Sequence, residues 1–270
     1  FAVPVVVYPQ ASLAFLDIVT QSTDALREKA LSQMASLPEG NTKRRAELQR
    51  IADGLAHIRT ETPRTFHEAL QLLWLYALLA GVINYGRLDD FLGPYLCRDL
   101  DSGVLTEEEA YRYIKSLWTM IENRRTTVNG RVIVGGKGRK HPREADRFLH
   151  IAMQVCKDCR YVEPQFTLRL TNDTDEQTWK EALDALGVGA TYPTLYNDEV
   201  NVPAVAYGMR VDEETAQRYV PFGCTEFVLW GQSTGTPNIC INLLKILNIY
   251  MKMKYHILQY LVNHLRTKYN

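Results

Sequence analysis

Short strand-like segments alternate with helix-length segments through the middle of the chain, and this alternation constrains the fold more than any other feature of the sequence. The strand-like segments are rich in β-branched and aromatic residues, whereas the segments between them carry apolar residues at helical spacing. The expected strands are Val128–Gly136, Pro164–Leu170 and Thr194–Val200, and the expected helices are Arg143–Cys156 and Asp175–Leu186. This order predicts an α/β fold with its strands gathered centrally.

The region before these strands is predicted to be mainly helical. Apolar positions recur at helical spacing over residues 12–61, with a break at Leu37–Asn41, where Pro and Gly occur. Thr65 and Thr106 are each followed three residues later by Glu, a pattern typical of a capping box at a helix start. We also expect one amphipathic helix at the far end of the chain, over Asn248–Asn270.

The composition excludes several classes of partner. Lysine plus arginine and aspartate plus glutamate number 31 each, so no net charge favours binding to nucleic acid or to a membrane surface. The longest apolar run, Leu70–Ile83, is too short to span a bilayer. Five cysteines, an odd number spread thinly, favour free thiols in a reducing compartment. We therefore expect a cytoplasmic protein.

The opening residues, FAVPVVVYPQ, are apolar but lack the basic region of a signal peptide. They begin without Met and inside a strand-like run. We expect the sequence to be a segment of something longer.

The stretch YVPFGCTEF, residues 219–227, holds the strongest candidate for chemistry. Cys224 and Glu226 lie two residues apart after Gly223, and in an extended segment such residues point the same way. A thiol performs hydrogen-atom or nucleophilic chemistry, and a carboxylate beside it transfers a proton. The alternative is a buried structural Cys in a core strand with Glu226 in an ion pair.

Other motifs favour structural roles. Cys156 and Cys159 have redox or zinc-ligand spacing, but a zinc site needs four ligands and no second Cys pair exists. The run GGKGRK, residues 135–140, is not a P-loop, because no Ser or Thr follows the Lys, and a solvated basic turn is expected.

Two acidic segments have open interpretations. Asp198 and Glu199 follow an expected strand and could bind a cation or a hydroxylated substrate, or could cap the following turn. We expect a turn at residues 86–90, with a local ion pair between Arg87 and Asp89.

The order of segments carries further information. The succession is TFHEALQLLW, YGRLDDFLGPYLCRDLDSG, TEEEA, a Gly-Gly strand end, EPQFTLRL, TYPTLYNDEVNVPAV and RYVPFGCTEF. Over residues 46–248 it resembles the central part of the glycyl radical enzymes, the family that includes pyruvate formate-lyase and the radical dehydratases and lyases. The resemblance implies part of a ten-stranded β/α barrel, made of two five-stranded halves and surrounded by helices.

The resemblance also implies roles for the two candidate residues. Cys224 matches the cysteine that becomes a thiyl radical in the family's Gly-Cys-Val-Glu motif, and Glu226 matches its general base, while Thr225 replaces the usual Val. Pyruvate formate-lyase itself has two adjacent cysteines, so its particular reaction is disfavoured for this chain. We therefore expect a lyase or dehydratase that acts on a small polar substrate.

The family stores its radical on a glycine in a C-terminal Arg-Val-x-Gly-Tyr motif, which does not occur in these 270 residues. The resemblance implies no bound cofactor besides this glycyl radical, installed by an S-adenosylmethionine iron–sulfur activase in an anaerobic host. It also implies a homodimer.

We expect residues 1–270 to form one incomplete barrel domain, with 249–270 coming from a later segment. Two other hypotheses stay open. The first is a truncated or divergent relative without radical chemistry that serves as a binding or assembly subunit. The second is a thiol redox protein that uses Cys156 and Cys159.

Overall fold

The computed structural model of the protein describes residues 7–125, 130–223, 226–232 and 243–269. The chain divides into two compact units, Phe1–Gly235 and Thr236–Asn270. In the second unit the described residues form one helix, α10 (Leu243–Tyr269), which begins five residues before the expected helix. None of the described helices is long and apolar enough to cross a membrane.

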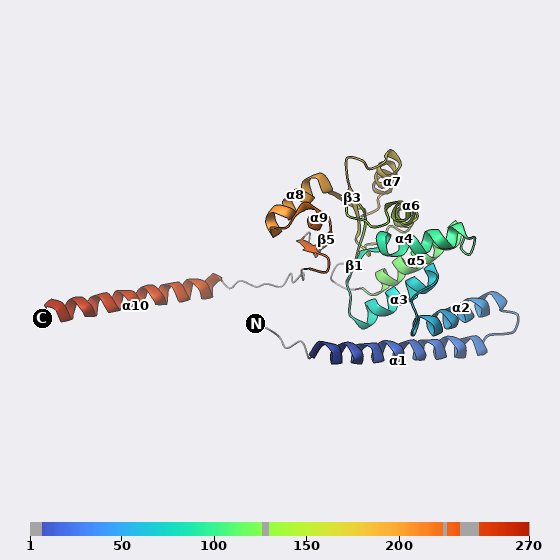
Figure 1. Ribbon diagram of the computed structural model, residues 1–270, viewed down its shortest axis with the longest axis horizontal. Coiled ribbons are helices and arrows are strands. Elements are labelled where there is room, and N and C mark those ends of the chain that lie inside the picture. The colour runs from blue at the N-terminus through green and yellow to red at the C-terminus, as the bar shows by residue number, and fades with distance from the viewer. Residues whose placement is uncertain (1–6, 126–129, 224–225, 233–242, 270) are drawn as a thin grey trace. The chain divides into compact units, whose positions relative to one another are not determined.

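The first unit alternates helices and strands as the sequence predicts (Figure 1). Its elements are α1 (Val7–Ala35), α2 (Thr42–Ile58), α3 (Phe66–Leu79), β1 (Asn84–Arg87), α4 (Leu88–Asp101), α5 (Glu107–Asn123), β2 (Arg131–Gly135), α6 (Pro142–Cys159), β3 (Phe166–Leu170), α7 (Glu176–Gly187), β4 (Thr194–Asn197), α8 (Asp198–Met209), α9 (Glu213–Ala216), β5 (Tyr219–Phe222) and β6 (Glu226–Leu229).

Strands β1 to β4 form a parallel sheet in chain order, and β5 and β6 form a separate antiparallel hairpin. One or two helices connect each parallel strand to the next and return the chain to the start of that strand, which parallel pairing requires. The mixed α/β fold is thus confirmed.

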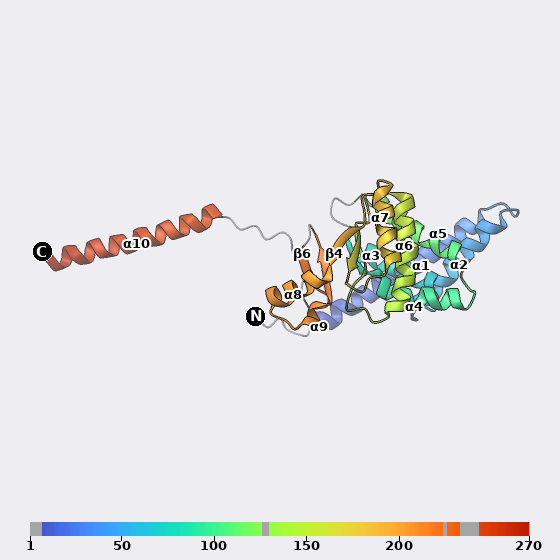
Figure 2. The same ribbon diagram turned by 90° about the horizontal axis from the view of Figure 1, so that it is seen from above.

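The two faces of the sheet have different neighbours. Helices α3 to α7 lie on one side, while α8, α9 and the hairpin lie on the other (Figures 1 and 2). Because side chains alternate along a strand, the apolar residues of β2 and β3 point toward the helices and join their core. They are Val132, Val134, Phe166 and Leu168. The residues between them point to the opposite side, which we call the inner face: Arg131, Ile133, Thr167, Arg169 and Tyr196.

Close helix packing depends on Gly93 in α4. A Cβ atom at this position would lie 2.7 Å from the backbone oxygen of Glu144 in α6. Real Cβ atoms do not approach backbone this closely, so any side chain here would push α4 and α6 apart. These two helices pack on the outer face of the sheet, the face opposite the inner face, where both contact β2. Close packing between them therefore helps to bury this strand.

The two expected capping boxes have different outcomes. At α5 the box is confirmed, because Thr106 accepts from the backbone N–H of Glu109 and the Glu109 carboxylate accepts from the N–H of Thr106. At α3 only half forms. Thr65 accepts from the N–H of Glu68 at 3.2 Å, but the Glu68 carboxylate binds the backbone and guanidinium of Arg64. The Glu68 carboxylate therefore accepts from the backbone N–H and the guanidinium of Arg64, and not from the backbone N–H of Thr65 as a full capping box requires.

Two segments differ from the expectation. Residues 86–90 do not form a turn, because β1 ends at Arg87 and α4 begins at Leu88. The strand expected to reach Val200 ends at Asn197, where the Asn side chain accepts from the N–H of Glu199 and starts α8. In both places a strand passes directly into a helix, and the acidic residues lie in the helix's first turn.

Candidate functional site

The hairpin places the predicted catalytic segment over the inner face of the sheet. Strand β5 contacts β1 and β2, and Asn84 donates a hydrogen bond to the Pro221 carbonyl at 2.9 Å. In the hairpin, Phe222 pairs with Glu226, so residues 223–225 form the connection between the strands. Of these three residues only Gly223 is described, and Cys224 and Thr225 lie outside the described residues. The prediction for Cys224 therefore stays a prediction.

Gly223 has a backbone conformation that favours glycine, and it lies beside Glu226. Its φ of +54° lies in the left-handed region, which favours glycine. A Cβ atom on Gly223 would also lie 2.6 Å from Oε2 of Glu226. The exposed Glu226 carboxylate therefore lies directly beside the backbone of the residue that precedes Cys224.

Arg131 connects the sheet to the hairpin connection. This side chain begins β2 and its residue is only 4% exposed. Its guanidinium donates to the Gly223 carbonyl at 3.1 Å, to Thr167 Oγ1 at 2.8 Å and to Gln165 Oε1 at 2.9 Å. Three segments far apart in the sequence therefore meet at one buried cation.

Tyr196, from β4, lies beside the same group of residues. Burial raises the pKa of its hydroxyl, the positive charge of Arg131 and a hydrogen-bonding contact with the Arg131 side chain oppose that rise, and the negative charge of Glu226 adds to it. The Tyr196 hydroxyl and Nε of Arg131 are both buried, and neither forms a hydrogen bond of normal geometry with a described residue. The inner face near Gly223 thus holds unsatisfied polar atoms.

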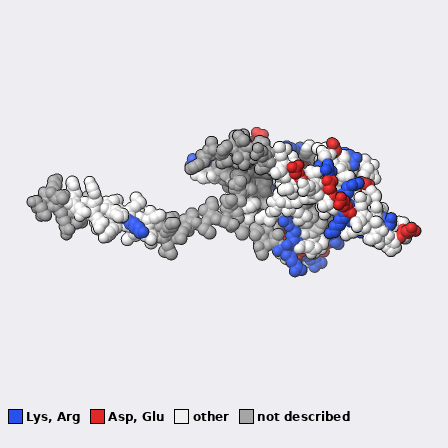
Figure 3. Space-filling view, turned by 90° about the horizontal axis from the view of Figure 1, so that it is seen from below, with Lys and Arg blue, Asp and Glu red and all other residues white. Residues whose placement is uncertain are grey.

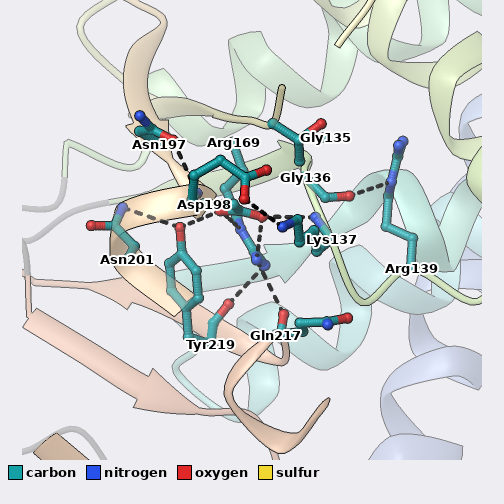
Figure 4. Close-up of polar contacts among 12 residues, drawn as sticks. Gly135, Gly136, Lys137, Arg139, Arg169, Asn197, Asp198, Asn201, Gln217 and Tyr219 are labelled. Atoms are coloured by element: carbon teal, nitrogen blue, oxygen red, sulfur yellow. Dashed lines mark hydrogen bonds and ion pairs between the residues drawn. The ribbon is translucent and has the colours of Figure 1, made fainter. Parts of the chain in front are cut away.

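A buried ion pair lies further along the inner face, at the carboxyl ends of the strands (Figure 4). Arg169 and Asp198 are both 0% exposed, and two hydrogen bonds of 2.9 and 2.7 Å join their side chains. Arg169 also donates to the backbone carbonyls of Gln217 and Tyr219, at 3.1 and 3.0 Å. The pair therefore fixes the chain where it enters β5.

Tyr219 completes this contact. Its hydroxyl donates to Asp198 Oδ1 at 2.6 Å and its ring faces the Arg169 guanidinium, with 3.8 Å from the ring centre to the guanidinium carbon. Burial raises the pKa of this phenol, and its nearness to Asp198 adds to the shift. Tyr219 is thus held protonated, as a donor to Asp198, at the base of the hairpin.

Arg87 and Asp89 form the expected ion pair, with 3.8 Å between Nε and Oδ1, but inside the protein. Arg87 donates to the carbonyls of Gly135 and Lys137, and Asp89 accepts from the N–H of Gly135 at 2.8 Å. Burial lowers the pKa of Arg87 to about 10 and raises that of Asp89. These contacts fix the Gly-Gly turn after β2.

The GGKGRK segment is an ordered turn whose polar groups are already engaged. The Lys137 backbone N–H donates to Asp198, and the Lys137 ammonium lies 2.7 Å from Glu199. Arg139 pairs with Asp146. These donors are therefore not presented to a phosphate, and the acids at 198 and 199 serve as partners of cations within the protein.

Cys156 and Cys159 do not have the features of a reactive pair. Cys156 is buried in α6, its thiol donates to the Tyr192 carbonyl, and burial raises its pKa to about 12. Burial also raises the pKa of Cys159. Reactive thiols instead have a lowered pKa, so the environment of these two disfavours the redox hypothesis.

Alkylation of Cys156 should accordingly be about 10³-fold slower at pH 8 in the folded protein than in urea, since the thiolate fraction would fall to about 10⁻⁴. The rate should rise about tenfold per pH unit until the thiol ionises. Timed iodoacetamide labelling with mass spectrometry measures each cysteine separately. Equal rates in folded and unfolded protein would contradict the buried environment.

Sequence reasoning missed the inner-face residues Arg131, Arg169, Tyr196 and Tyr219. A usable signal existed for Arg169, because a charged residue inside the apolar strand FTLRL must be paired when the strand is buried. Among the described residues, no group of three or more His, Cys, Asp or Glu side chains could hold a metal ion.

Comparison with known proteins identifies the family. The family model described as Pyruvate formate lyase-like matches residues 9–258, so the chain belongs to this family. It is 25% identical over 249 residues to isethionate sulfite-lyase from Desulfovibrio desulfuricans, covering 82% of this chain and 30% of that protein. It is also 25% identical over 230 residues to (2S)-3-sulfopropanediol dehydratase from Klebsiella oxytoca, covering 77% of this chain and 28% of that protein.

Solved structures show the same fold. The glycerol-bound B12-independent glycerol dehydratase from Clostridium butyricum has a TM-score of 0.70 at 23% identity, over 80% of this chain and 29% of that one. A glycyl radical enzyme from Archaeoglobus fulgidus has a TM-score of 0.69 at 22% identity, over 80% and 30%. The chain spans about 30% of the length of the curated relatives named above.

Proposed function

We propose that this chain is part of a glycyl-radical-type lyase or dehydratase that acts on a small polar substrate. The observation that carries the proposal is the family match over residues 9–258. The named relatives are a sulfite-lyase and a dehydratase, and each removes a leaving group from a small molecule. The hairpin over the inner face supports the assignment, because it brings the segment around Gly223 against the sheet's polar side chains.

In this proposal Cys224 and Glu226 have separate roles. When present, the glycyl radical would take the hydrogen atom of the Cys224 thiol, which would leave the unpaired electron on the sulfur. The sulfur of Cys224 takes a hydrogen atom from a substrate carbon, so that an S–H bond forms and a C–H bond breaks. Glu226 accepts the proton of the hydroxyl on the same carbon, and the leaving group then departs from the adjacent carbon, as sulfite or as a hydroxide that takes this proton from Glu226 to form water. The Cys224 thiol returns its hydrogen atom to the product radical, which restores the sulfur radical. Proton transfer of this kind contributes about 10²–10⁴-fold.

The proposal includes the barrel. The sheet has helices on its outer face and buried polar groups on its inner face, which suits one wall of the proposed ten-stranded barrel with the hairpin inside it. Residues 1–270 would form an incomplete part of that domain, with 249–270 from a later segment.

We further propose a cytoplasmic homodimer in an anaerobic host, activated by an S-adenosylmethionine iron–sulfur enzyme. The composition is balanced, and in Figure 3 acidic and basic side chains are mixed over the right-hand part of the face, with basic side chains gathered along its lower edge.

Anaerobic activation tests this function. The protein that contains this chain is treated with an activating enzyme of the family, examined by electron paramagnetic resonance, and supplied with diols, hydroxysulfonates and hydroxy acids. We expect a persistent carbon-centred doublet, followed by loss of water or sulfite from one substrate class. Absence of both signals, with activation of a known family member as the positive control, would instead support the binding or assembly subunit.

A further inference from the structure

The inner face contains a buried cation that lacks an acidic partner. Three arginines are buried in the part of the chain that the structure describes: Arg87, Arg131 and Arg169. Arg87 is paired with Asp89, and Arg169 with Asp198. Arg131, although only 4% exposed, forms no ion pair with a described Asp or Glu.

The partners of Arg131 are all neutral, and they leave part of the guanidinium unsatisfied. Its Nη atoms donate to a hydroxyl, an amide oxygen and a backbone carbonyl, whereas its Nε has no partner among the described residues. Tyr196, 8% exposed, presents a second buried polar atom, its hydroxyl oxygen, which contacts the Arg131 side chain but forms no hydrogen bond of normal geometry with a described residue. These two groups come from different strands and lie close enough for the Arg131 charge to affect the phenol.

Physical chemistry disfavours this arrangement in the absence of an anion. A buried charge is costly unless it is paired, and a buried donor without an acceptor adds its own desolvation cost. A carboxylate or sulfonate would neutralise Arg131 and accept hydrogen bonds from Nε and the phenol. Guanidinium groups suit these anions because their planar N–H groups match two oxygens at once.

We propose that Arg131, assisted by Tyr196, binds the anionic group of the substrate, and that the substrate is a small hydroxylated carboxylate or sulfonate. This inference rests on the proposed function and names the substrate class of the same site. Arg131 holds the carbonyl of Gly223, so the bound anion would lie near the residue that precedes Cys224 in the chain. The positive charge of Arg131 would also offset the repulsion between the substrate anion and the nearby Glu226 carboxylate.

Binding to the unactivated protein tests the proposal without radical chemistry. Lactate and 1,2-propanediol are suitable probes, because they share a carbon chain and a hydroxyl but differ in the carboxylate. Titrations monitored by saturation-transfer NMR should show that lactate binds at least about tenfold more tightly than 1,2-propanediol. Arg131→Gln should remove this preference, and Arg131→Lys, which keeps the charge but not the planar donors, should retain part of it.

Tyr196→Phe gives a variant that is expected to fold, since it removes a hydroxyl that forms no hydrogen bond of normal geometry with a described residue. It should weaken lactate binding several-fold and leave propanediol binding unchanged. Arg50→Gln is the control, because Arg50 is an exposed arginine on α2, and both affinities should stay the same. Lactate binding no tighter than propanediol, or a preference that survives in both Arg131→Gln and Tyr196→Phe, would overturn the proposal. Radical activation can fail without changing this result, so the two hypotheses are tested separately.

Discussion

Replacing Asp198 with asparagine should lower the free energy of unfolding by about 3 kcal/mol, because removing one member of a buried ion pair leaves the other charge uncompensated. Arg169 would remain in a fully buried position with a neutral amide in place of a carboxylate. Asn also provides only one acceptor oxygen, whereas Asp198 accepts from Arg169, Tyr219 and the backbone of Lys137. Urea unfolding followed by circular dichroism measures the change.

Glu199→Gln provides a matched control one residue further along the same helix. Glu199 also pairs with a cation, Lys137, at the same distance of 2.7 Å. Both side chains of this pair are about one-third exposed, however, at 35% for Lys137 and 30% for Glu199. Exposed pairs contribute little because water and salt screen them. The urea midpoint of this variant should therefore stay near that of the parent protein. Equal effects of the two substitutions would contradict the importance of burial.

The Asp198 variant should also affect the hairpin. The same Arg169 guanidinium that Asp198 holds also binds the backbone of Gln217 and Tyr219, so we expect its position to change in the variant. Hydrogen exchange at the β5 amides should therefore become faster in Asp198→Asn, beyond the change in the strands β1 to β3. This result would link the ion pair to the position of the segment that carries Cys224.

Much of the fold was predictable because it depends on patterns within single segments. Strands β2 and β3 and helices α5, α6 and α7 follow from apolar spacing and caps such as Thr106. The junctions were less predictable. A turn at residues 86–90 and a β-strand to Val200 are reasonable from local propensity, but the buried partners of Asp89 and Asp198 favour an immediate helix start at both places.

The candidate site was only partly predictable for a similar physical reason. Cys224 and Glu226 stand out because they are close in sequence and differ in chemistry. Arg131 and Tyr196 become neighbours only after β2, β3 and β4 are aligned side by side, and no short spacing connects them. Pairings of this kind require the register of the sheet, which a single sequence does not reveal.

Replacing Cys224 with alanine should reduce turnover by at least about 10⁵-fold, because the variant has no sulfur to take and return the hydrogen atom. The glycyl radical doublet should remain after anaerobic activation, since in the proposed mechanism Cys224 acts only after the radical is installed. Loss of the doublet together with turnover would indicate failed activation or folding and would contradict a purely catalytic role. Cys159→Ala, at a partly exposed thiol away from the hairpin, should keep turnover within about twofold of the parent.

Glu226→Gln separates proton transfer from hydrogen-atom transfer. We expect turnover to fall about 10²–10⁴-fold, since the amide has nearly the same shape but accepts no proton. Exchange of the substrate's reactive hydrogen should continue, because Cys224 still abstracts it before the leaving group departs. Tritium or deuterium transfer from labelled substrate measures this step independently of product formation. If Glu226→Gln abolishes exchange as completely as Cys224→Ala does, the carboxylate is needed before hydrogen abstraction and does not act as the base proposed above.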